Sequence, residues 1–419
     1  MHEVHPVPYS LCERAEDRVK WSTNQLRPLL DKARKRGFAL LKIHSHPTGY
    51  PRFSGVDDAS DAILFPSVHG WVDGEDPHAS AVMLPDGRVF GRVHHSDGAI
   101  ADLTAVTVIG DDLQIWRPDD GRADALPEFA LRHIQAFGEG TFRALRGLRV
   151  AVVGCSGTGS LVVDMLARLG VGALVLVDPE RVEEKNLNRI VNALGRHLGS
   201  LKVDVMREFV EGLGFGTRIE TFPTDLFDPK VVRAVAGCDV VVGCMDSVDG
   251  RHLLNRIAAF YLQPYFDVGV ALEADKKGGV EQICGGVHYL QPGRSSLLSR
   301  GAFTLERVRA EVLRRTDSEL YAALVKEKYI KGIQADRPAV NAVNMVFAGQ
   351  GVMELLMRLH PCRIDPNGDY ARHTTSLTGG FWLNFPEGPV DEALARYAGR
   401  GDMTPLLDMP MLDLKDRAA

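Results

Sequence analysis

The stretch 150–189 constrains the fold of this chain more than any other part of it. An apolar run rich in β-branched residues (150–153) leads into a glycine turn, and an amphipathic segment follows. A second apolar run, 173–177, then ends on Asp178. This order of elements predicts a βαβ unit that carries an acidic residue at the tip of its second strand.

Three glycines form the turn of this unit: Gly154, Gly157 and Gly159. Glycine lets the backbone approach a phosphate group, the start of the following helix favours negative charge, and Asp178 can accept hydrogen bonds from a ribose. The unit therefore predicts a nucleotide-binding site. It does not by itself identify the nucleotide, because nicotinamide and flavin enzymes use the same unit.

Charged residues beyond Asp178 favour a nucleoside triphosphate. They include two cations and a distal carboxylate: Arg189, Lys202 and Asp246. A hydride-transfer site has no general need for such a set, whereas Arg and Lys neutralise the oxygens of a triphosphate. Asp246 directly follows a mostly apolar run, 239–245, and a carboxylate at a strand end can hold a magnesium ion.

This spacing resembles the ThiF/MoeB/ubiquitin-activating-enzyme superfamily over residues 128–385. The residues that carry the resemblance are Gly157, Asp178, Asn186, Arg189, Lys202 and Asp246. It implies that ATP binds at the glycine turn, Asp178 and Asn186, that Arg189 and Lys202 hold the phosphates, and that Mg²⁺ binds Asp246. The implied reaction is adenylation of the C-terminal carboxylate of a ubiquitin-like protein that ends in glycine, with release of pyrophosphate.

The segment 131–138, LRHIQAFG, resembles the entry helix of the same superfamily. In that family an arginine of this helix reaches the ATP bound by a partner subunit. Arg132 occupies the corresponding position. The resemblance therefore implies a homodimer in which Arg132 acts across the subunit interface.

Ubiquitin-activating enzymes usually carry a crossover cysteine that takes the acyl group as a thioester, because a thiolate is a strong nucleophile near neutral pH. Related bacterial sequences often show a Cys-Leu-x-Cys run here, where this chain has Ser296 to Ser299, and no cysteine occurs from 285 to 361. Three outcomes stay open, in order of preference. The enzyme stops at the adenylate, Ser296 accepts the acyl group as an oxyester, or Cys284 reaches the site after a loop movement.

Other features favour structural roles. We interpret Cys155, Cys284 and Cys362 primarily as structural thiols, because free cysteine is commonly buried. The charge-dense segment 305–331 predicts a helical crossover with a solvated face. The largely apolar segment 338–359 predicts a helix that packs against the sheet or a dimer partner rather than binding a ligand.

A second set of chemical residues lies near the N-terminus. A short apolar strand, 39–43, delivers His44 and His46 to one face, because alternate strand residues point the same way. Asp57 follows after a turn rich in Pro and Gly, with Ser54 three residues before it. Two imidazoles and one carboxylate are a usual catalytic zinc set that leaves one position for water. The pattern therefore predicts a Zn²⁺ site.

This pattern resembles the JAB/JAMM metalloprotease family, which removes ubiquitin-like proteins from their conjugates, over residues 1–115. In that family zinc activates water, a serine helps to stabilise the oxyanion, and an upstream glutamate is the general base. Ser54 matches the serine, but Glu3 lies slightly too close to His44 to match the glutamate. We favour a missing base, with Glu3 in an altered arrangement as the alternative; a start upstream of Met1 would also account for the gap.

Composition excludes several classes of protein. The chain has 419 residues, 45% of them hydrophobic, which suffices for two or three cored domains. The net charge of −6 gives no sign of a nucleic-acid-binding surface. No apolar run is long enough for a membrane span, and the N-terminus lacks the apolar region of a signal peptide. Six cysteines without a CxxC pair suit a reducing cytoplasm.

We therefore predict an α/β chain whose N-terminal JAB/JAMM-like α/β domain precedes a Rossmann-like doubly wound adenylation domain. The predicted order is domain 1–115, linker 116–130, adenylation domain 131–385 and C-terminal tail 386–419. The leading hypothesis is activation of a ubiquitin-like protein in a bacterial conjugation pathway of the kind linked to antiviral defence, with a conjugating enzyme as a further partner.

Two alternatives stay open at this point. A sulfur-carrier adenylyltransferase would use the same chemistry, but the fused protease-like domain argues against it. A scaffold with two degenerate sites would only bind partners. The complete set of Arg189, Lys202 and Asp246 argues against a scaffold for the second domain and leaves the first undecided.

Overall fold

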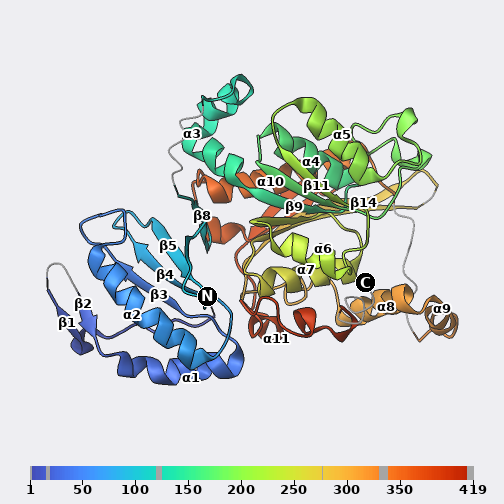
Figure 1. Cartoon of the computed structure of the whole chain (residues 1–419). Coiled ribbons are helices and arrows are strands. Elements are labelled where there is room, and N and C mark those ends of the chain that lie inside the picture. Colours follow the sequence, from blue (N-terminus) through green and yellow to red (C-terminus); the bar gives the residue numbers. More distant parts are fainter. Residues whose placement is uncertain (1, 16–18, 119–124, 276, 330–337, 413–419) are drawn as a thin grey trace. The chain divides into compact units, whose positions relative to one another are not determined.

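The computed structural model describes residues 2–15, 19–118, 125–275, 277–329 and 338–412 (Figure 1). These residues divide into two compact units. The larger unit is built from residues 1–2, 109–113 and 125–419, and the smaller from 3–108 and 114–124. No helix among the described residues is both long enough and apolar enough to cross a membrane.

The larger unit is organised around one eight-stranded sheet. Its spatial order is β11-β10-β9-β12-β13-β14-β15-β16, with β9 to β13 parallel and β14 to β16 antiparallel. The strands are β9 (Arg149–Val153), β10 (Ala173–Val177), β11 (Arg218–Phe222), β12 (Val240–Gly243), β13 (Tyr265–Ala274), β14 (Val280–Leu290), β15 (Arg372–Ser376) and β16 (Phe381–Phe385). The chain order therefore reverses between β9 and β12, which is the point where open α/β sheets bind ligands.

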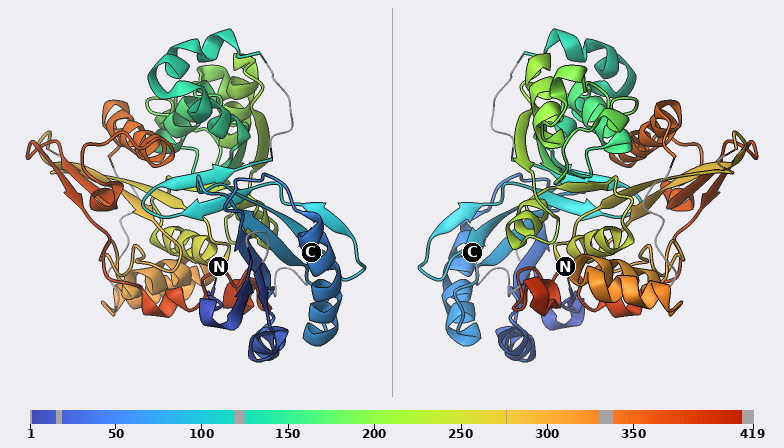
Figure 2. Two further views of the ribbon diagram at one scale, coloured as in Figure 1. Left: turned by 90° about the vertical axis from the view of Figure 1, so that its left-hand side faces the viewer. Right: turned by 90° about the vertical axis from the view of Figure 1, so that its right-hand side faces the viewer.

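Helices cover both faces of the parallel strands. Figure 1 shows α4, α5 and α10 on one face and α6 and α7 on the other, and the same two layers are visible in Figure 2. The helices are α3 (Leu131–Gly147), α4 (Gly157–Arg168), α5 (Lys202–Leu213), α6 (Pro229–Ala236), α7 (Val248–Phe260), α8 (Leu305–Thr316), α9 (Ser318–Lys326), α10 (Asn341–Leu359) and α11 (Glu392–Ala395). Burial on both faces explains why β10 and β12 are continuous apolar runs rather than alternating ones. The predicted doubly wound α/β sheet is confirmed.

The C-terminal segment is part of this unit. Leu406, Leu407 and Leu412 are 3%, 0% and 0% exposed, and they join the apolar core on the α7 side of the sheet. Arg256 of α7 donates from Nε to the Leu407 carbonyl oxygen at 2.6 Å. The segment after residue 386 therefore contributes to the core of the larger unit.

The smaller unit contains a four-stranded sheet in the order β3-β4-β5-β6. β3 (Leu41–Ser45) is parallel to β4 (His78–Met83), while β5 (Val89–His94) and β6 (Ile100–Asp102) continue antiparallel. Its helices α1 (Arg27–Arg36) and α2 (Gly55–Val72) share a small core of Leu26, Leu30 and Val68. Two short hairpins are β1 (Cys12–Arg14) with β2 (Val19–Trp21), and β7 (Val106–Ile109) with β8 (Leu113–Trp116).

A buried ionic cluster ties α10 to β15 in the larger unit. Glu354 and Arg358 are 1% and 0% exposed, and Arg358 Nε donates to Glu354 Oε1 at 2.6 Å. His373 Nε2 lies 2.6 Å from Glu354 Oε2, to which Arg363 also donates. Burial alone would raise the pKa of the Glu354 carboxyl, but the hydrogen bond with His373 and the charge of Arg358 hold this pKa at about 2.

Replacing Glu354 with glutamine should make stability less sensitive to acid. Folding lowers the pKa of this carboxyl, so its stabilisation is complete above the ordinary pKa of 4.5 and is lost as the pH falls toward about 2. We expect the difference in unfolding free energy between wild type and Glu354→Gln to shrink by about 2 kcal/mol between about pH 6 and about pH 3. Urea unfolding across this range tests the prediction, and a difference independent of pH would contradict it.

Candidate functional site

The glycine turn after β9 has no room for side chains at two positions. Gly154 has a φ of 90°, and a Cβ atom on it would lie 2.8 Å from the Cys244 carbonyl oxygen. A Cβ on Gly159 would lie 1.7 Å from the Gly154 carbonyl oxygen. The turn can therefore be built only with glycine at these positions. It brings the carboxyl ends of β9 and β12 into contact where the strand order reverses.

The third glycine of the turn, Gly157, is the first residue of α4. A Cβ on it would lie 2.3 Å from Asn344 Nδ2 and 3.2 Å from Arg189 Cδ. Arg189 is half-buried, and its Nη1 donates to the Lys185 carbonyl oxygen at 2.6 Å. The structure therefore brings Arg189, predicted from the sequence, and Asn344, which the sequence analysis did not single out, to the start of α4.

Asp178 lies at the tip of β10 and is 5% exposed. Its Oδ2 accepts a hydrogen bond from the Cys155 backbone N–H at 2.7 Å, and its Oδ1 accepts one from that of Glu180 at 2.9 Å. Burial raises the pKa of Asp178, while the positive charge of Lys202 acts in the opposite direction. The carboxylate is thus anchored to the glycine turn by a backbone donor, which fixes its orientation.

Lys202 opens α5 and is 1% exposed. Its ammonium group is ion-paired with the Glu180 carboxylate, which is itself largely exposed. Asn186, 3% exposed, ends the short 3-10 helix Glu184–Asn186 and accepts from the Glu183 N–H at 3.1 Å. The positive charge of Lys202 acts on Asp178, while its ammonium group is ion-paired with Glu180.

Asp246 lies in the turn between β12 and α7, and it is exposed. Within the described ranges, no hydrogen bond or ion pair engages its carboxylate.

Helix α8 fixes the backbone just beyond Asp246. Glu311, 8% exposed, accepts from the N–H groups of Val248 and Asp249, the latter at 3.2 Å. Arg315 Nε donates to Asp249 Oδ2 at 3.1 Å. The predicted crossover helix therefore has a defined task, since it caps α7 and holds the turn that carries Asp246.

Arg132 lies in the first turn of α3, on the exposed surface of the larger unit. Its Nη1 donates to Gln135 Oε1 at 3.4 Å. Its predicted action across a subunit interface stays a prediction.

The two alternative acyl acceptors are both poorly suited to attack. Ser296 is 3% exposed, and its hydroxyl donates to Asp391 Oδ2 at 2.6 Å, so the side chain serves to fasten the segment that begins α11. Cys284 lies in β14, opposite Ala271 and Ser376 on the neighbouring strands. Burial and the nearby negative charge of Glu273 raise the pKa of the Cys284 thiol, which disfavours the nucleophilic thiolate.

The other two cysteines that the sequence analysis singled out differ in burial. Cys155 in the glycine turn is completely buried, and burial raises its pKa well above the ordinary value, as a structural thiol requires. Cys362, which follows α10, is exposed, so the burial on which its interpretation as a structural thiol rested is contradicted. The apolar pattern of α10 ends at Leu359, and the turn after it faces solvent.

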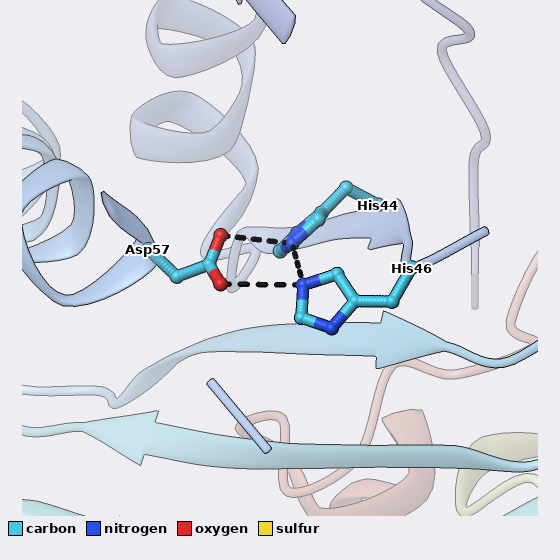
Figure 3. Close-up of side chains that lie close together, drawn as sticks. All are labelled: His44, His46 and Asp57. Carbon is cyan, nitrogen blue, oxygen red and sulfur yellow. Dashed lines mark hydrogen bonds and ion pairs between the residues drawn. The ribbon is translucent and has the colours of Figure 1, made fainter. Parts of the chain in front are cut away.

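The smaller unit brings the three predicted zinc ligands together (Figure 3). His44 lies on β3, and His46 is the first residue after that strand. Asp57 lies in the first turn of α2. The distance from His44 Nε2 to Asp57 Oδ1 is 2.9 Å, that from His46 Nε2 to Asp57 Oδ2 is 3.3 Å, and the two Nε2 atoms are 3.2 Å apart. Two nitrogen donors and a carboxylate converge on one point, which fits the ligand chemistry of zinc.

Residues around this triad hold its members in place. The Ser54 hydroxyl donates to Asp57 Oδ2 at 2.6 Å, and the Ser54 backbone N–H donates to the same oxygen at 2.7 Å. The ring of His46 is fixed through a hydrogen bond of 2.9 Å between Nδ1 and the Tyr50 carbonyl oxygen. Ser54 therefore caps α2 and orients Asp57. The sequence predicts a different role for Ser54, namely contact with an oxyanion.

Glu3, the alternative general base, is held elsewhere. Its carboxylate accepts from Lys32 Nζ at 2.5 Å and lies 3.1 Å from His5 Nε2. These hydrogen bonds lower the pKa of Glu3. A carboxylate with a lowered pKa is a weaker proton acceptor, and this favours the preferred interpretation that the smaller unit lacks its base.

The larger unit is similar to proteins of a known family. The model of the ThiF family matches residues 130–378. The SAMP-activating enzyme E1 of Haloferax volcanii is 38% identical over 122 residues, which cover 29% of this chain and 45% of that protein. Ubiquitin-like modifier-activating enzyme 5 of Caenorhabditis elegans is 29% identical over 185 residues, which cover 41% of this chain and 42% of that protein. The matches therefore span less than half the length of these curated relatives.

A solved structure agrees with the fold. Escherichia coli MccB, crystallised with MccA-N7isoASN, has a TM-score of 0.50 and 17% sequence identity, and the match covers 64% of this chain and 74% of that one. At this identity the likeness shows the fold alone. The family model, in contrast, matches more than half of the chain and includes the glycine turn, Asp178, Arg189, Lys202 and Asp246. The chain therefore belongs to the ThiF family.

Proposed function

We propose that this protein activates the C-terminal carboxylate of a ubiquitin-like protein or peptide by ATP-dependent adenylation. The observation that carries the proposal is the contact between the carboxyl ends of β9 and β12, which joins the glycine turn to the turn bearing Asp246. The curated relatives support it, since they are by name a SAMP-activating enzyme and a ubiquitin-like modifier-activating enzyme.

In the proposed reaction a carboxylate oxygen of the partner attacks the α-phosphorus of ATP. The bond from the α-phosphorus to the bridging oxygen breaks, pyrophosphate leaves, and an acyl-adenylate forms. Arg189 and Lys202 neutralise phosphate oxygens, with Lys202 released from Glu180. Asp246 would hold Mg²⁺, which supplies charge stabilisation at the phosphates. Asp178 and Asn186 complete the nucleotide pocket on the β10 side.

The finer parts of the proposal rest on the family resemblance. They are a homodimer in which Arg132 reaches the partner's nucleotide, a cytoplasmic bacterial conjugation pathway linked to antiviral defence, and a conjugating enzyme as a further partner. The exposed position of Arg132 on α3 is compatible with a role at an interface.

Replacing Asp246 with alanine should abolish adenylation. We expect ATP–pyrophosphate exchange to fall by about 100-fold or more, because the metal-bound phosphates lose their protein carboxylate. The assay uses wild type and a candidate ubiquitin-like protein that ends in glycine. The control is Asp164→Ala, which removes a carboxylate paired with Arg168 on α4. Undiminished exchange in Asp246→Ala would overturn the proposed role of this residue, and its absence in wild type would favour a scaffold.

We further propose that the smaller unit is a zinc-binding, deconjugase-like domain without a conventional general base. His44, His46 and Asp57 would hold the ion, because their ligand atoms all lie within 4.8 Å of one another. A bound zinc ion lowers the pKa of a coordinated water molecule. With Glu3 ion-paired to Lys32, the unit offers no free carboxylate at that position to accept the proton, so recognition of the partner is favoured over efficient hydrolysis.

The zinc proposal predicts a metal content that depends on the histidines. Wild type should contain about one zinc ion per chain, and His44→Ala and His46→Ala should lose most of it, because two remaining ligands bind weakly. His95→Ala, which changes an exposed histidine of the same unit, should keep it. Elemental analysis of the purified proteins provides the measurement. Equal zinc in all four proteins, or none in zinc-supplemented wild type, would contradict the proposal.

We also propose that the reaction ends at the adenylate on this chain. Ser296 is buried and bonded to Asp391, and burial raises the pKa of Cys284. After incubation with ATP and partner, intact-mass measurement should therefore find no covalent acyl-enzyme. An adduct labile to base and absent from Ser296→Ala would establish an oxyester instead. An adduct labile to thiol and absent from Cys284→Ala would establish a thioester.

A further inference from the structure

One polar side chain at the glycine turn has no assigned task. Asn344 lies in the first turn of α10 and is 5% exposed. Its Nδ2 atom lies 2.3 Å from the position that a Cβ on Gly157 would occupy. The amide therefore fills the space that the missing side chain of Gly157 leaves, directly against the start of α4.

The Asn344 side chain makes no hydrogen bond within the part of the chain that the structure describes. The NH2 groups of two other buried amides of the same unit have protein acceptors. Gln263 Nε2 donates to the carbonyl oxygens of Val235 and Cys238 at 2.8 and 2.6 Å, and Asn367 Nδ2 donates to Asp112 Oδ1 at 2.7 Å. Gln263 Oε1 and Gln350 Oε1 of the same unit also lack a partner, so the position of Asn344 against the glycine turn, rather than its missing bond alone, points to a ligand.

Helix packing alone does not require an amide at this place, because an apolar residue of similar size would also pack against Gly157. The amide of Asn344 keeps some contact with solvent. A ligand that accepts a hydrogen bond at the start of α4 would use its free N–H groups.

The surroundings indicate the chemistry of this ligand. The side chain of Arg189 approaches the same point on Gly157, with Cδ at 3.2 Å, so a cationic residue and an amide donor flank the start of a helix. Backbone N–H groups at a helix start also favour an anion. The amide donor and the helix start, with the cationic side chain of Arg189 beside them, are complementary to phosphate oxygens.

We propose that Asn344 is a catalytic residue of the adenylation site, whose Nδ2 donates a hydrogen bond to a phosphoryl oxygen of the bound nucleotide. The proposal rests on the proposed function and extends it to α10, a helix that the sequence analysis assigned to packing alone. It also gives Gly157 a second task, because any larger residue there would displace the amide from the phosphate.

The test compares the stability of the free protein with its affinity for Mg-ATP. In Asn344→Leu no hydrogen bond among the described residues is lost, so we expect the thermal unfolding midpoint without nucleotide to stay unchanged or to rise. The Kd for Mg-ATP should increase by about tenfold or more, because a hydrogen bond to a charged group is lost. Asn344→Asp should weaken binding further than Asn344→Leu, because it places an anion against the phosphate.

Gln350→Ala is the matched control. Gln350 is an amide of the same helix that donates to Thr375 Oγ1 at 3.3 Å, away from the glycine turn, and this variant should bind Mg-ATP as wild type does. Wild-type affinity in both Asn344 variants would overturn the inference and leave adenylation standing. A lowered midpoint in Asn344→Leu with unchanged affinity would show a structural role and overturn it too. If folded wild type does not bind Mg-ATP, the proposed function and this inference both fail.

Discussion

The close approach of Gly154 to the end of β12 is the constraint on which the larger unit depends. The Cys244 carbonyl oxygen lies 2.8 Å from the position that a Cβ on residue 154 would occupy, and the Gly154 carbonyl oxygen lies 1.7 Å from that of a Cβ on residue 159. Strand β9, helix α4 and strand β12 can therefore meet only through bare backbone. Because strand order reverses at the same place, this contact also decides where the chemical residues gather.

The polar residues around the turn are held by different means, and this separates their tasks. Asp178 is fixed by the N–H of Cys155, and Lys202 is ion-paired with Glu180. The Asp246 carboxylate is exposed, but the backbone beyond it is fixed because Glu311 caps α7. A carboxylate suits a metal ion when its backbone is rigid and its oxygens are not bonded to other protein groups. The oxygens are then free to coordinate the ion.

Local patterns in the sequence predicted the features that depend on short-range geometry. The βαβ unit follows from its glycines and apolar runs, and the shared face of His44 and His46 follows from strand alternation. Features that depend on distant segments were not accessible. The Ser296 hydroxyl is occupied by Asp391, nearly a hundred residues later in the chain, and no pattern near residue 296 indicates this. Asn344 was hidden for the same reason, because only the fold brings α10 against the start of α4.

Helix α10 carries two kinds of buried polar residue, and their contrast bears on how a site can be recognised. Glu354 has its charge matched by Arg358 and Arg363 and its hydrogen bonds completed by His373, so the folded chain itself accounts for it. Asn344, three turns earlier on the same helix, has no such set of partners among the described residues. Gln350 Oε1 of the same helix also lacks a partner, so a missing bond by itself does not mark a site. Asn344 differs in its place against Gly157 at the start of α4, and the proposed contact with a phosphoryl oxygen rests on this place.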